Sequence, residues 1–446
     1  MFLRGTKPHS RLRRVEIPLR SAWHRWGLVA LSLLTAAILI PQACVLWIAN
    51  HRLNSEQVDV MERGAKLTPG DAAAWDRVGR LRQWDFLRPD LSEAIRDYLK
   101  AVHDEPRSAH YWMDLAGAYE VAGDKTRAKD AFARAKAVYP ASGEVAFHYG
   151  NFLLRQEKYD EAFEELRKAV RADPTLLPLA ISRTWRSTED VNQLINQVLP
   201  PNANAYFEAI DFFASSGRVE PALAVWQRLV ELNQPFDLPR SFPLIDDLIH
   251  EDRGEDARRV WREALAAAGL PHEDPRNNSL IWNGDFSKNF SNGGLDWRWK
   301  DVLGADFSFD STPGGNGSRS VRVDFTGGSN LTLAAPAQYV PVTPGRSYHF
   351  HALMRADGIT TESGMRFLIA DPNHGGAVSA MTENFTGSHD WTPVEADLMT
   401  APQTHFLLVD LIRNPSRLFD NRLAGTVWIA DVTLLPSDSQ AGTPPR

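Results

Sequence analysis

One uninterrupted run of apolar side chains, residues 27–49, constrains this sequence more than any other feature. The run extends over 23 residues without a charged side chain. An apolar helix of about 20 residues crosses the hydrocarbon core of a membrane. The sequence therefore predicts a single transmembrane helix at 27–49, which would place everything after it on one side of the membrane.

The charges that flank this run predict its orientation. Residues 1–26 carry seven Lys or Arg side chains against one acidic side chain, Glu16. Cytoplasmic flanks of membrane helices collect Lys and Arg, and indoles favour the membrane interface, where Trp23, Trp26 and Trp47 would lie. We expect residues 1–26 to form a basic cytoplasmic tail. The bulk of the chain would then be periplasmic or extracellular, anchored once in the inner or plasma membrane.

A cleaved signal peptide is the alternative interpretation of the same run. Signal peptides have a shorter apolar core and a small-residue cleavage site. Here the run is long and ends in Leu-Trp-Ile-Ala, without a clear A-x-A pattern. A lipoprotein signal would need a leucine three residues before its cysteine, and Pro41 stands at that distance from Cys44. The sequence favours an uncleaved anchor.

Charge and cysteine content limit what the external region can be. The whole chain carries −7 and the basic tail +6, so the part after the apolar run carries −13. A surface this acidic argues against nucleic acid as a partner, because phosphate binding needs basic side chains. The one cysteine, Cys44, lies inside the apolar run. No disulfide can form in the external domains, which must be stabilised by core burial.

A helical pattern with a period of 34 residues follows, after a helical lead-in predicted at 50–74. Its clearest unit is 109–142, where Trp112, Leu115 and Tyr119 share one face of a helix. Gly123-Asp124 breaks that helix, and a second helix runs from there to Pro140. Corresponding residues recur 34 positions later and 34 positions earlier, so the pattern predicts stacked helix pairs.

This pattern resembles the tetratricopeptide repeat (TPR), a helix–turn–helix of 34 residues with W-x2-L-G-x2-Y, A-x3-F and a proline. The signature residues are Trp112, Leu115, Tyr119, Ala128, Phe132, Ala135, Pro140, Gly150, Ala162 and Pro174. The unit at 75–108 fits only if about three additional residues lie in the turn at 83–90. Two weaker units follow, at 206–229 and 244–264, after an irregular stretch at 177–202. We therefore predict a TPR-like α-solenoid over 75–270.

The resemblance implies that a protein partner docks in the groove of the solenoid. In this family, Lys and Asn side chains on first helices can clamp a peptide carboxylate. Asn151 matches one such position, but His110, Met113 and Gly117 stand where partners would be needed, so that clamp is expected to be absent. The alternative is a solenoid that serves only as a spacer or dimer surface, because repeat identity does not fix function.

The pattern changes after a polar, proline-containing linker at 271–279. From residue 280 apolar side chains alternate with polar ones, which is typical of half-buried strands. The inward-facing sets expected are Val321, Val323 and Phe325; Tyr348, Phe350, Ala352 and Met354; Met365, Phe367 and Ile369; and Leu407, Val409 and Leu411. These runs predict an antiparallel β-sandwich over 280–436. A disordered tail is expected at 437–446.

The order of motifs in this region resembles the jelly-roll carbohydrate-binding modules of galactose-binding-like fold. Asn-Gly-Asp-Phe opens the region at 283–286, Pro-Gly-x-x-Tyr follows at 344–348, and Trp-Ile-Ala-Asp-Val closes it at 428–432. In those modules the opening and closing acids often hold a structural calcium. Asp285 and Asp431 match, whereas Ser287 and Ala430 replace two carboxylates, which removes ligands that calcium prefers. No cofactor is expected, with calcium at this pair as the alternative.

The resemblance also implies a glycan partner, held by an aromatic platform and polar side chains. Trp297, Trp391 and Trp428 stand at positions that are usually core, while Trp282 and Tyr339 are freer to form platforms. The carbohydrate-binding candidates are Arg298, Trp299, Asn373, His374, Asn384, Phe385 and Arg413. One argument speaks against Trp299 as an exposed platform. Residues two apart in a strand share a face, and Trp297 is expected to point inward.

No catalytic motif stands out in the sequence. It contains no H-E-x-x-H, G-x-S-x-G or phosphate-binding loop. We therefore expect a multidomain α + β, non-catalytic accessory protein of the cell envelope. Its solenoid would dock a protein and its sandwich would bind a glycan, as in exopolysaccharide or O-antigen assembly or export. The alternative is a structural scaffold whose sandwich mediates packing without binding sugar.

Overall fold

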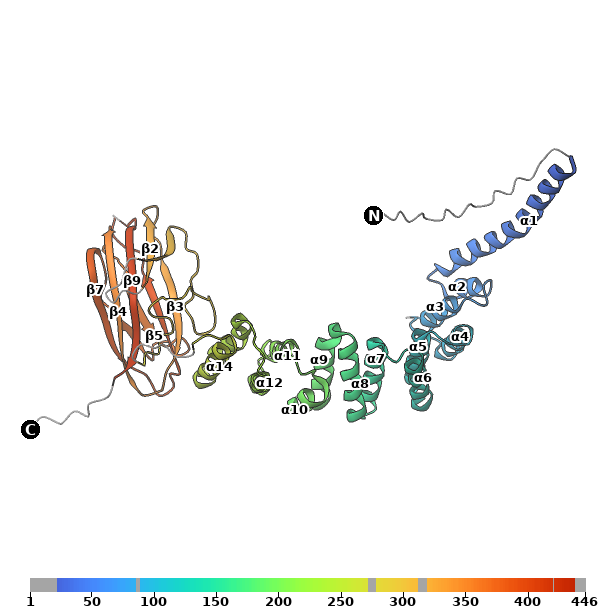
Figure 1. Ribbon diagram of the computed structural model, residues 1–446, viewed down its shortest axis with the longest axis horizontal. Coiled ribbons are helices and arrows are strands. Elements are labelled where there is room, and N and C mark those ends of the chain that lie inside the picture. Colours follow the sequence, from blue (N-terminus) through green and yellow to red (C-terminus); the bar gives the residue numbers. More distant parts are fainter. Residues whose placement is uncertain (1–21, 86–88, 272–277, 312–318, 420, 438–446) are drawn as a thin grey trace, which may run out of the picture. The chain divides into compact units, whose positions relative to one another are not determined.

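The computed structural model describes residues 22–85, 89–271, 278–311, 319–419 and 421–437 (Figure 1). The terminal tails up to residue 21 and from residue 438, together with most of the predicted linker, lie outside the described residues. The chain divides into two compact units, residues 1–152 and 153–446.

The predicted apolar run lies within one helix, α1 (Ala22–Leu53), which includes Pro41. Its segment Arg25–Leu53 has a mean hydropathy of 2.2 in its most apolar window and no part of that window buried against the protein. By length and composition this segment could cross a membrane, although a signal sequence would meet the same criteria. Trp23, Trp26 and Trp47 are all exposed.

The helices that follow in the first unit are α2 (Val58–Ala65), α3 (Ala72–Gln83), α4 (Leu91–Asp104), α5 (Ala109–Val121) and α6 (Lys125–Val138), with α7 (Gly143–Arg155) at its boundary. Aspartates cap several of these helices, because a carboxylate can accept the unpaired backbone N–H groups of a first turn. Asp71 accepts from the Ala74 N–H (3.1 Å) and Asp124 from that of Arg127 (2.9 Å). Gly123, at φ +79°, makes the break between α5 and α6.

The repeat register is confirmed by a pair of equivalent hydrogen bonds. The indole Nε1 of Trp75 donates to the Pro69 carbonyl (3.1 Å), and that of Trp112 donates to the Pro106 carbonyl (3.0 Å). These indoles are 37 residues apart, so three residues more than the repeat length lie between them, in the long turn that joins α3 to α4. The prediction for the unit at 75–108 is therefore correct.

The signature residues occupy the places that the pattern predicts. Buried positions are Leu115, Tyr119, Ala128, Phe132, Ala135, Gly150 and Ala162, while Trp112 is half-buried and Pro140 and Pro174 lie exposed beyond helix ends. The small alanines allow helices to approach closely, and Phe132 fills the space between them. Its ring lies 5.6 Å from that of Tyr149 and 5.2 Å from that of Phe152.

The second unit continues with α8 (Tyr159–Ala172), α9 (Leu177–Thr188), α10 (Val191–Gln193), α11 (Ala203–Ala214), α12 (Val219–Glu231), α13 (Phe242–His250) and α14 (Gly254–Ala267). The stretch at 177–202, which the sequence predicts to be irregular, is irregular in the structure. Glu189, at φ +51°, ends α9, and α10 continues into a π-helical turn, Leu194–Val198. The weaker units coincide with α11–α12 and α13–α14, and their apolar faces are buried.

Two antiparallel sheets form the rest of the second unit. One has the order β1 (Ala305–Asp310), β2 (Ser320–Thr326), β9 (Ala424–Pro436), β4 (Ser347–Ile359) and β7 (Gly387–Met399). The other has the order β3 (Leu333–Pro341), β8 (Phe406–Arg413), β5 (Arg366–Ala370) and β6 (Ser379–Met381).

A single core lies between the two sheets. It joins Phe350 and Ile429 of the first sheet to Phe367 and Val409 of the second, with Trp297 fully buried beside them. The alternation that the sequence shows is confirmed, because every residue predicted to face inward in β2, β4, β5 and β8 is buried. Two sheets that share one core in this way form a sandwich.

Candidate functional site

Helices α13 and α14 pack directly against the sandwich within the second unit. The contact depends on two glycines in the loop before β1. A Cβ at Gly293 would lie 2.1 Å from Cδ2 of Phe242, and one at Gly294 would lie 2.4 Å from Cζ3 of Trp261. Gly294 also has φ +58°, which favours glycine. The loop can therefore lie flat on both helices, and we call this contact the junction.

Polar side chains complete the junction. Arg298 forms an ion pair with Asp246 of α13. The Asn373 amide donates to the Ile249 carbonyl (3.1 Å) and to Asp252 (3.0 Å). His374 contacts Asp371 at 3.2 Å and lies 4.0 Å from Asp252. Three of the carbohydrate-binding candidates, Arg298, Asn373 and His374, thus contact the protein's own helices or loops.

The other four candidates contact residues of the sandwich itself. Trp299 is half-buried and stacks on Phe307 with 4.5 Å between ring centroids, as the shared-face objection anticipates. Phe385 is buried in the core. The Asn384 amide bridges two backbone positions, accepting from the Gly364 N–H (3.0 Å) and donating to the Glu362 carbonyl (2.7 Å). Packing against Phe307 already uses one face of the Trp299 ring, so a platform centred on Trp299 stays a prediction.

Arg413 is fully buried at the end of β8. Its guanidinium donates to the Ser363 carbonyl (3.1 Å), to Asn330 (2.8 Å) and to the Leu331 carbonyl. Burial lowers the pKa of this guanidinium from its ordinary value. Arg413 joins loops of the sandwich and cannot contact a ligand at the surface, which corrects its assignment to a glycan site.

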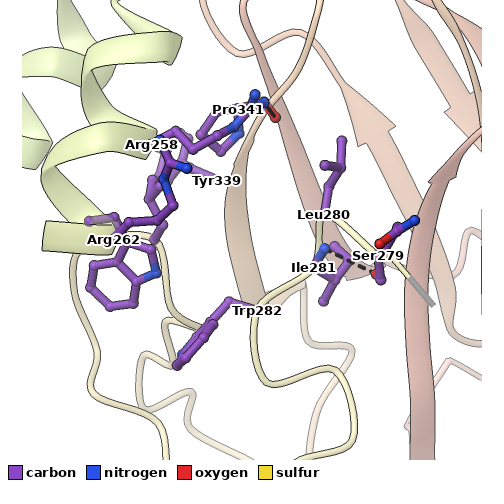
Figure 2. Close-up of a pocket in the computed structure, with 11 residues that line it drawn as sticks. Arg258, Arg262, Ser279, Leu280, Ile281, Trp282, Tyr339 and Pro341 are labelled. Carbon is purple, nitrogen blue, oxygen red and sulfur yellow. Dashed lines mark hydrogen bonds between the residues drawn. The ribbon is translucent and has the colours of Figure 1, made fainter. Parts of the chain in front are cut away.

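A pocket of about 310 Å³ opens at the junction instead (Figure 2). It lies between α14 and the sandwich, and its lining includes Arg258, Trp261, Arg262, Trp282, Tyr339 and Pro341. Trp282 and Tyr339 are two of the aromatic residues that the sequence left free to form platforms. From the sequence Trp261 is assigned only to a repeat, and Arg258 and Arg262 have no assigned role, although an arginine pair four residues apart beside a tryptophan is a visible signal.

The aromatic part of the pocket consists of two indoles, one of which has a buried N–H group without an acceptor among the described residues. Trp261 and Trp282 meet edge to face, with ring centroids 5.9 Å apart and planes at 88°. Trp261 is only 4% exposed, and no described residue accepts a hydrogen bond from its buried Nε1–H. An unsatisfied buried donor costs about 1–3 kcal/mol.

The charged part of the pocket consists of two guanidiniums. Arg258 is half-buried and donates to the Pro341 carbonyl (2.6 Å), and burial lowers its pKa from the ordinary value. Arg262 is exposed. Among the described residues neither arginine forms an ion pair with a carboxylate. The pocket therefore suits a ligand with an anionic group, several oxygens and an apolar face.

The two residues proposed to hold calcium lie on neighbouring backbone segments. The Val432 N–H donates to the Gly284 carbonyl (2.9 Å), which brings the opening and closing motifs together. Asp285 accepts from the Ser287 N–H (3.1 Å), and Asp431 is largely buried at φ +51°. This arrangement leaves a calcium site at Asp285 and Asp431 a prediction.

Comparison with known proteins identifies the central helices. A family model described as "Tetratricopeptide repeat" matches residues 90–137 and 121–176. Residues 90–176 are tetratricopeptide repeats. Small glutamine-rich tetratricopeptide repeat-containing protein 2 of Mycosarcoma maydis is 31% identical over 86 residues, which are 19% of this chain and 24% of that relative. The chain thus spans about a quarter of that relative's length.

Solved structures with low overall similarity are also found. Two crystal structures of MamA give TM-scores of 0.26 and 0.28 at 17% and 16% identity. The matches cover 39% and 43% of this chain and 85% and 90% of the MamA chains. YrrB, described as a TPR protein with an unusual peptide-binding site, gives a TM-score of 0.25 at 16% identity, covering 48% of this chain and 94% of its own.

Proposed function

We propose that this protein is a membrane-anchored, non-catalytic adaptor of the cell envelope, with helical repeats that dock a protein partner and a sandwich that binds a glycan. The match of residues 90–176 to the tetratricopeptide repeat carries the docking role. Stacked repeats of this type create extended concave binding surfaces. The first helices, α3 and α5 among them, would line that surface.

The membrane anchor in this proposal rests on α1 and on the basic residues before it. Six Lys or Arg side chains precede α1, which is long and apolar enough to span a bilayer, and a seventh, Arg25, lies near the start of this helix. Positive charge favours the cytoplasmic side. The N-terminus would then be cytoplasmic, and the repeats and sandwich would be periplasmic or extracellular, on the plasma or inner membrane.

One labelling experiment tests docking and topology together. Gly117→Cys places a thiol on α5 where a Cβ meets nothing within 4 Å, and Arg134→Cys places one on the exposed side of α6. Right-side-out vesicles from the protein's own cells are treated with a membrane-impermeant maleimide that carries a photoreactive group. We expect both thiols to be labelled, and a discrete adduct to form on illumination only from position 117.

Each failure in that experiment has a separate meaning. Labelling of both thiols only after the vesicles are lysed would contradict the proposed orientation. Equal adducts from positions 117 and 134, or none from either, would contradict docking through the first helices. Cys44 is replaced by alanine in both variants, because it is the one native cysteine and lies in the apolar run.

The glycan role is proposed for the junction pocket rather than for the sequence candidates. The order of motifs in the sandwich resembles carbohydrate-binding modules, and the pocket combines two indoles with two guanidiniums. Aromatic faces stack on sugar rings, and arginine pairs with carboxylates in a bidentate manner. An acidic saccharide fits this chemistry, and assembly or export of an envelope polysaccharide is the role we propose for it.

The scaffold alternative also has a specific observation in its favour. Arg298 and Asn373 already contact α13 or the turn after it, so the sandwich uses polar side chains for packing. Under this alternative the pocket would be a consequence of the junction and would bind no saccharide.

Calorimetric titration of the full chain in detergent separates the two alternatives. The probes are an oligogalacturonate, which is acidic, and an oligomannoside of equal length, which is neutral. We expect only the acidic probe to bind. Arg262→Ala should weaken its affinity by roughly tenfold or more, since a hydrogen bond to a charged group contributes about 1.5–3 kcal/mol.

Arg259→Ala is the matched control, because Arg259 lies on the same helix, pairs with Asp256 and does not line the pocket. The Arg259→Ala variant should bind the acidic probe with the same affinity as the unmodified chain. Absence of binding, or equal weakening by the two substitutions, would favour the scaffold.

A further inference from the structure

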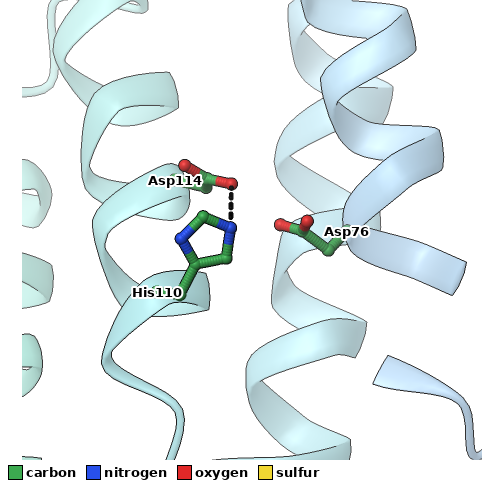
Figure 3. Close-up of side chains that lie close together, drawn as sticks. All are labelled: Asp76, His110 and Asp114. Atoms are coloured by element: carbon green, nitrogen blue, oxygen red, sulfur yellow. Dashed lines mark ion pairs between the residues drawn. The ribbon is translucent and has the colours of Figure 1, made fainter. Parts of the chain in front are cut away.

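A cluster of metal-ligating side chains lies between the first helices of two successive repeats (Figure 3). Asp76 comes from α3, and His110 and Asp114 come from α5. One ligand atom from each residue lies within 4.8 Å of the other two. His110 and Asp114 are four residues apart, so they share one face of α5, and Figure 3 shows the Asp76 carboxylate directed toward them.

The two carboxylates are poorly compensated by the described residues around them. Asp76 is 1% exposed, and its Oδ1 has no hydrogen-bond partner among those residues. Arg80 is the cation beside both acids, with 2.7 Å from its Nη2 to Oδ2 of Asp76 and 3.7 Å from its Nε to Oδ2 of Asp114. His110 Nε2 lies 3.6 Å from the same Asp114 oxygen.

Asp76 and Asp114 bring two carboxyl groups together, and among the described residues Arg80 is the one arginine or lysine within 4 Å of both. A buried carboxylate oxygen without a partner is costly, and a bound cation would satisfy it.

We propose that Asp76, His110 and Asp114 form a binding site for a divalent transition-metal ion, with Zn²⁺ as the best fit. An imidazole nitrogen with carboxylate oxygens is a donor set that zinc accepts, whereas calcium takes oxygen ligands and usually six to eight of them. Imidazole suits zinc and its neighbours among the first-row metals. Arg80 is half exposed and can turn toward solvent when the ion binds.

The position of the site gives it a consequence for the repeats. Its ligands come from the first helices of two successive units, so an ion would link α3 to α5 within the first unit. Three protein ligands leave a fourth zinc position open. His110 stands at a position that, by resemblance, belongs to the groove, so this open position would be available to a side chain of a docked partner.

The proposal is tested by titrating Zn²⁺ into the full chain in detergent, without a tag and freed of metal. Co²⁺ is then used in place of Zn²⁺, because its absorption spectrum reports the ligands that bind the ion. We expect one tight ion per chain and a visible Co²⁺ band. His110→Ala should raise the dissociation constant of that ion by at least about tenfold. Mutation of residues that only hydrogen-bond a metal ligand already lowers metal affinity about 10–100-fold, and loss of a ligand should cost at least as much. Because His110 is exposed, this variant should keep the fold.

His148→Ala removes another exposed helical histidine, on α7, and should leave the affinity unchanged. Asp114→Asn keeps the size of the side chain and should abolish the Co²⁺ band. Zinc affinity that His110→Ala leaves unchanged, or no binding at millimolar zinc, would overturn the site.

Discussion

Phe132→Ala is expected to destabilise the first unit by about 3–5 kcal/mol, the usual cost of truncating a buried phenylalanine. The side chain is 3% exposed. Its ring contacts those of Tyr149 and Phe152, both on α7, so the substitution leaves a cavity between one helix pair and the next helix. In stacked repeats each repeat is stabilised by its neighbours. The loss of stability should therefore extend beyond α6.

Hydrogen exchange of backbone amides measures this effect without assuming two-state unfolding of a multidomain chain. Protection of α5, α6 and the part of α7 in the first unit should fall together in Phe132→Ala. Tyr139→Ala is the control, because its side chain is 59% exposed on the residue after α6. A loss of protection confined to α6, or none at all, would show that Phe132 does not couple these helices.

The sequence predicts the elements well because their side-chain period is a local property. It predicts less well where a motif and the alternation of a strand disagree. Trp428 was expected in the core by resemblance, yet its neighbours Val427 and Ile429 are fully buried and face inward. Successive side chains in a strand point to opposite faces. Trp428 therefore lies half-buried on the outer face, where Arg322 and Arg355 flank its ring at 5.4 Å and 5.0 Å.

The junction could not be predicted by the same reasoning. Arg298 meets Asp246 over 52 positions of sequence, and Asn373 meets Asp252 over 121. Polar residues near strand ends are equally compatible with a ligand and with another part of the chain, since either can satisfy their hydrogen bonds. Only the packing of α13 and α14 on the sandwich decides between them, and the same packing creates the pocket.

The buried carboxyl group of Asp410 is expected to make the stability of the sandwich depend strongly on pH. It lies on β8, paired with Ala337 of β3 and Leu368 of β5, and is 8% exposed. No described residue donates a hydrogen bond or forms an ion pair to its carboxylate. Burial alone raises the pKa of Asp410 from 3.8 to about 7. The folded state therefore holds this proton more tightly than the unfolded state does.

The direction of the effect follows from that difference. Between about pH 4 and pH 7 the folded chain binds the proton and the unfolded chain has lost it, so stability falls as pH rises through this range. From about pH 8 upward the loss is complete and constant. At 1.36 kcal/mol per pKa unit, a rise from 3.8 to about 7 corresponds to a penalty of about 4 kcal/mol at pH 8.

Asp410→Asn keeps the shape of the side chain and cannot ionise, so it should remove this penalty. Unfolding of the sandwich, followed by hydrogen exchange in β3, β5 and β8, should show a variant more stable than the unmodified chain at pH 8 and nearly equal to it at pH 4. Other carboxylates also titrate, and only the difference between the two chains isolates Asp410. Asp306→Asn, at an exposed position of β1, should give no such difference. A stabilisation by Asp410→Asn that is the same at both pH values would show that the Asp410 carboxylate does not carry this proton.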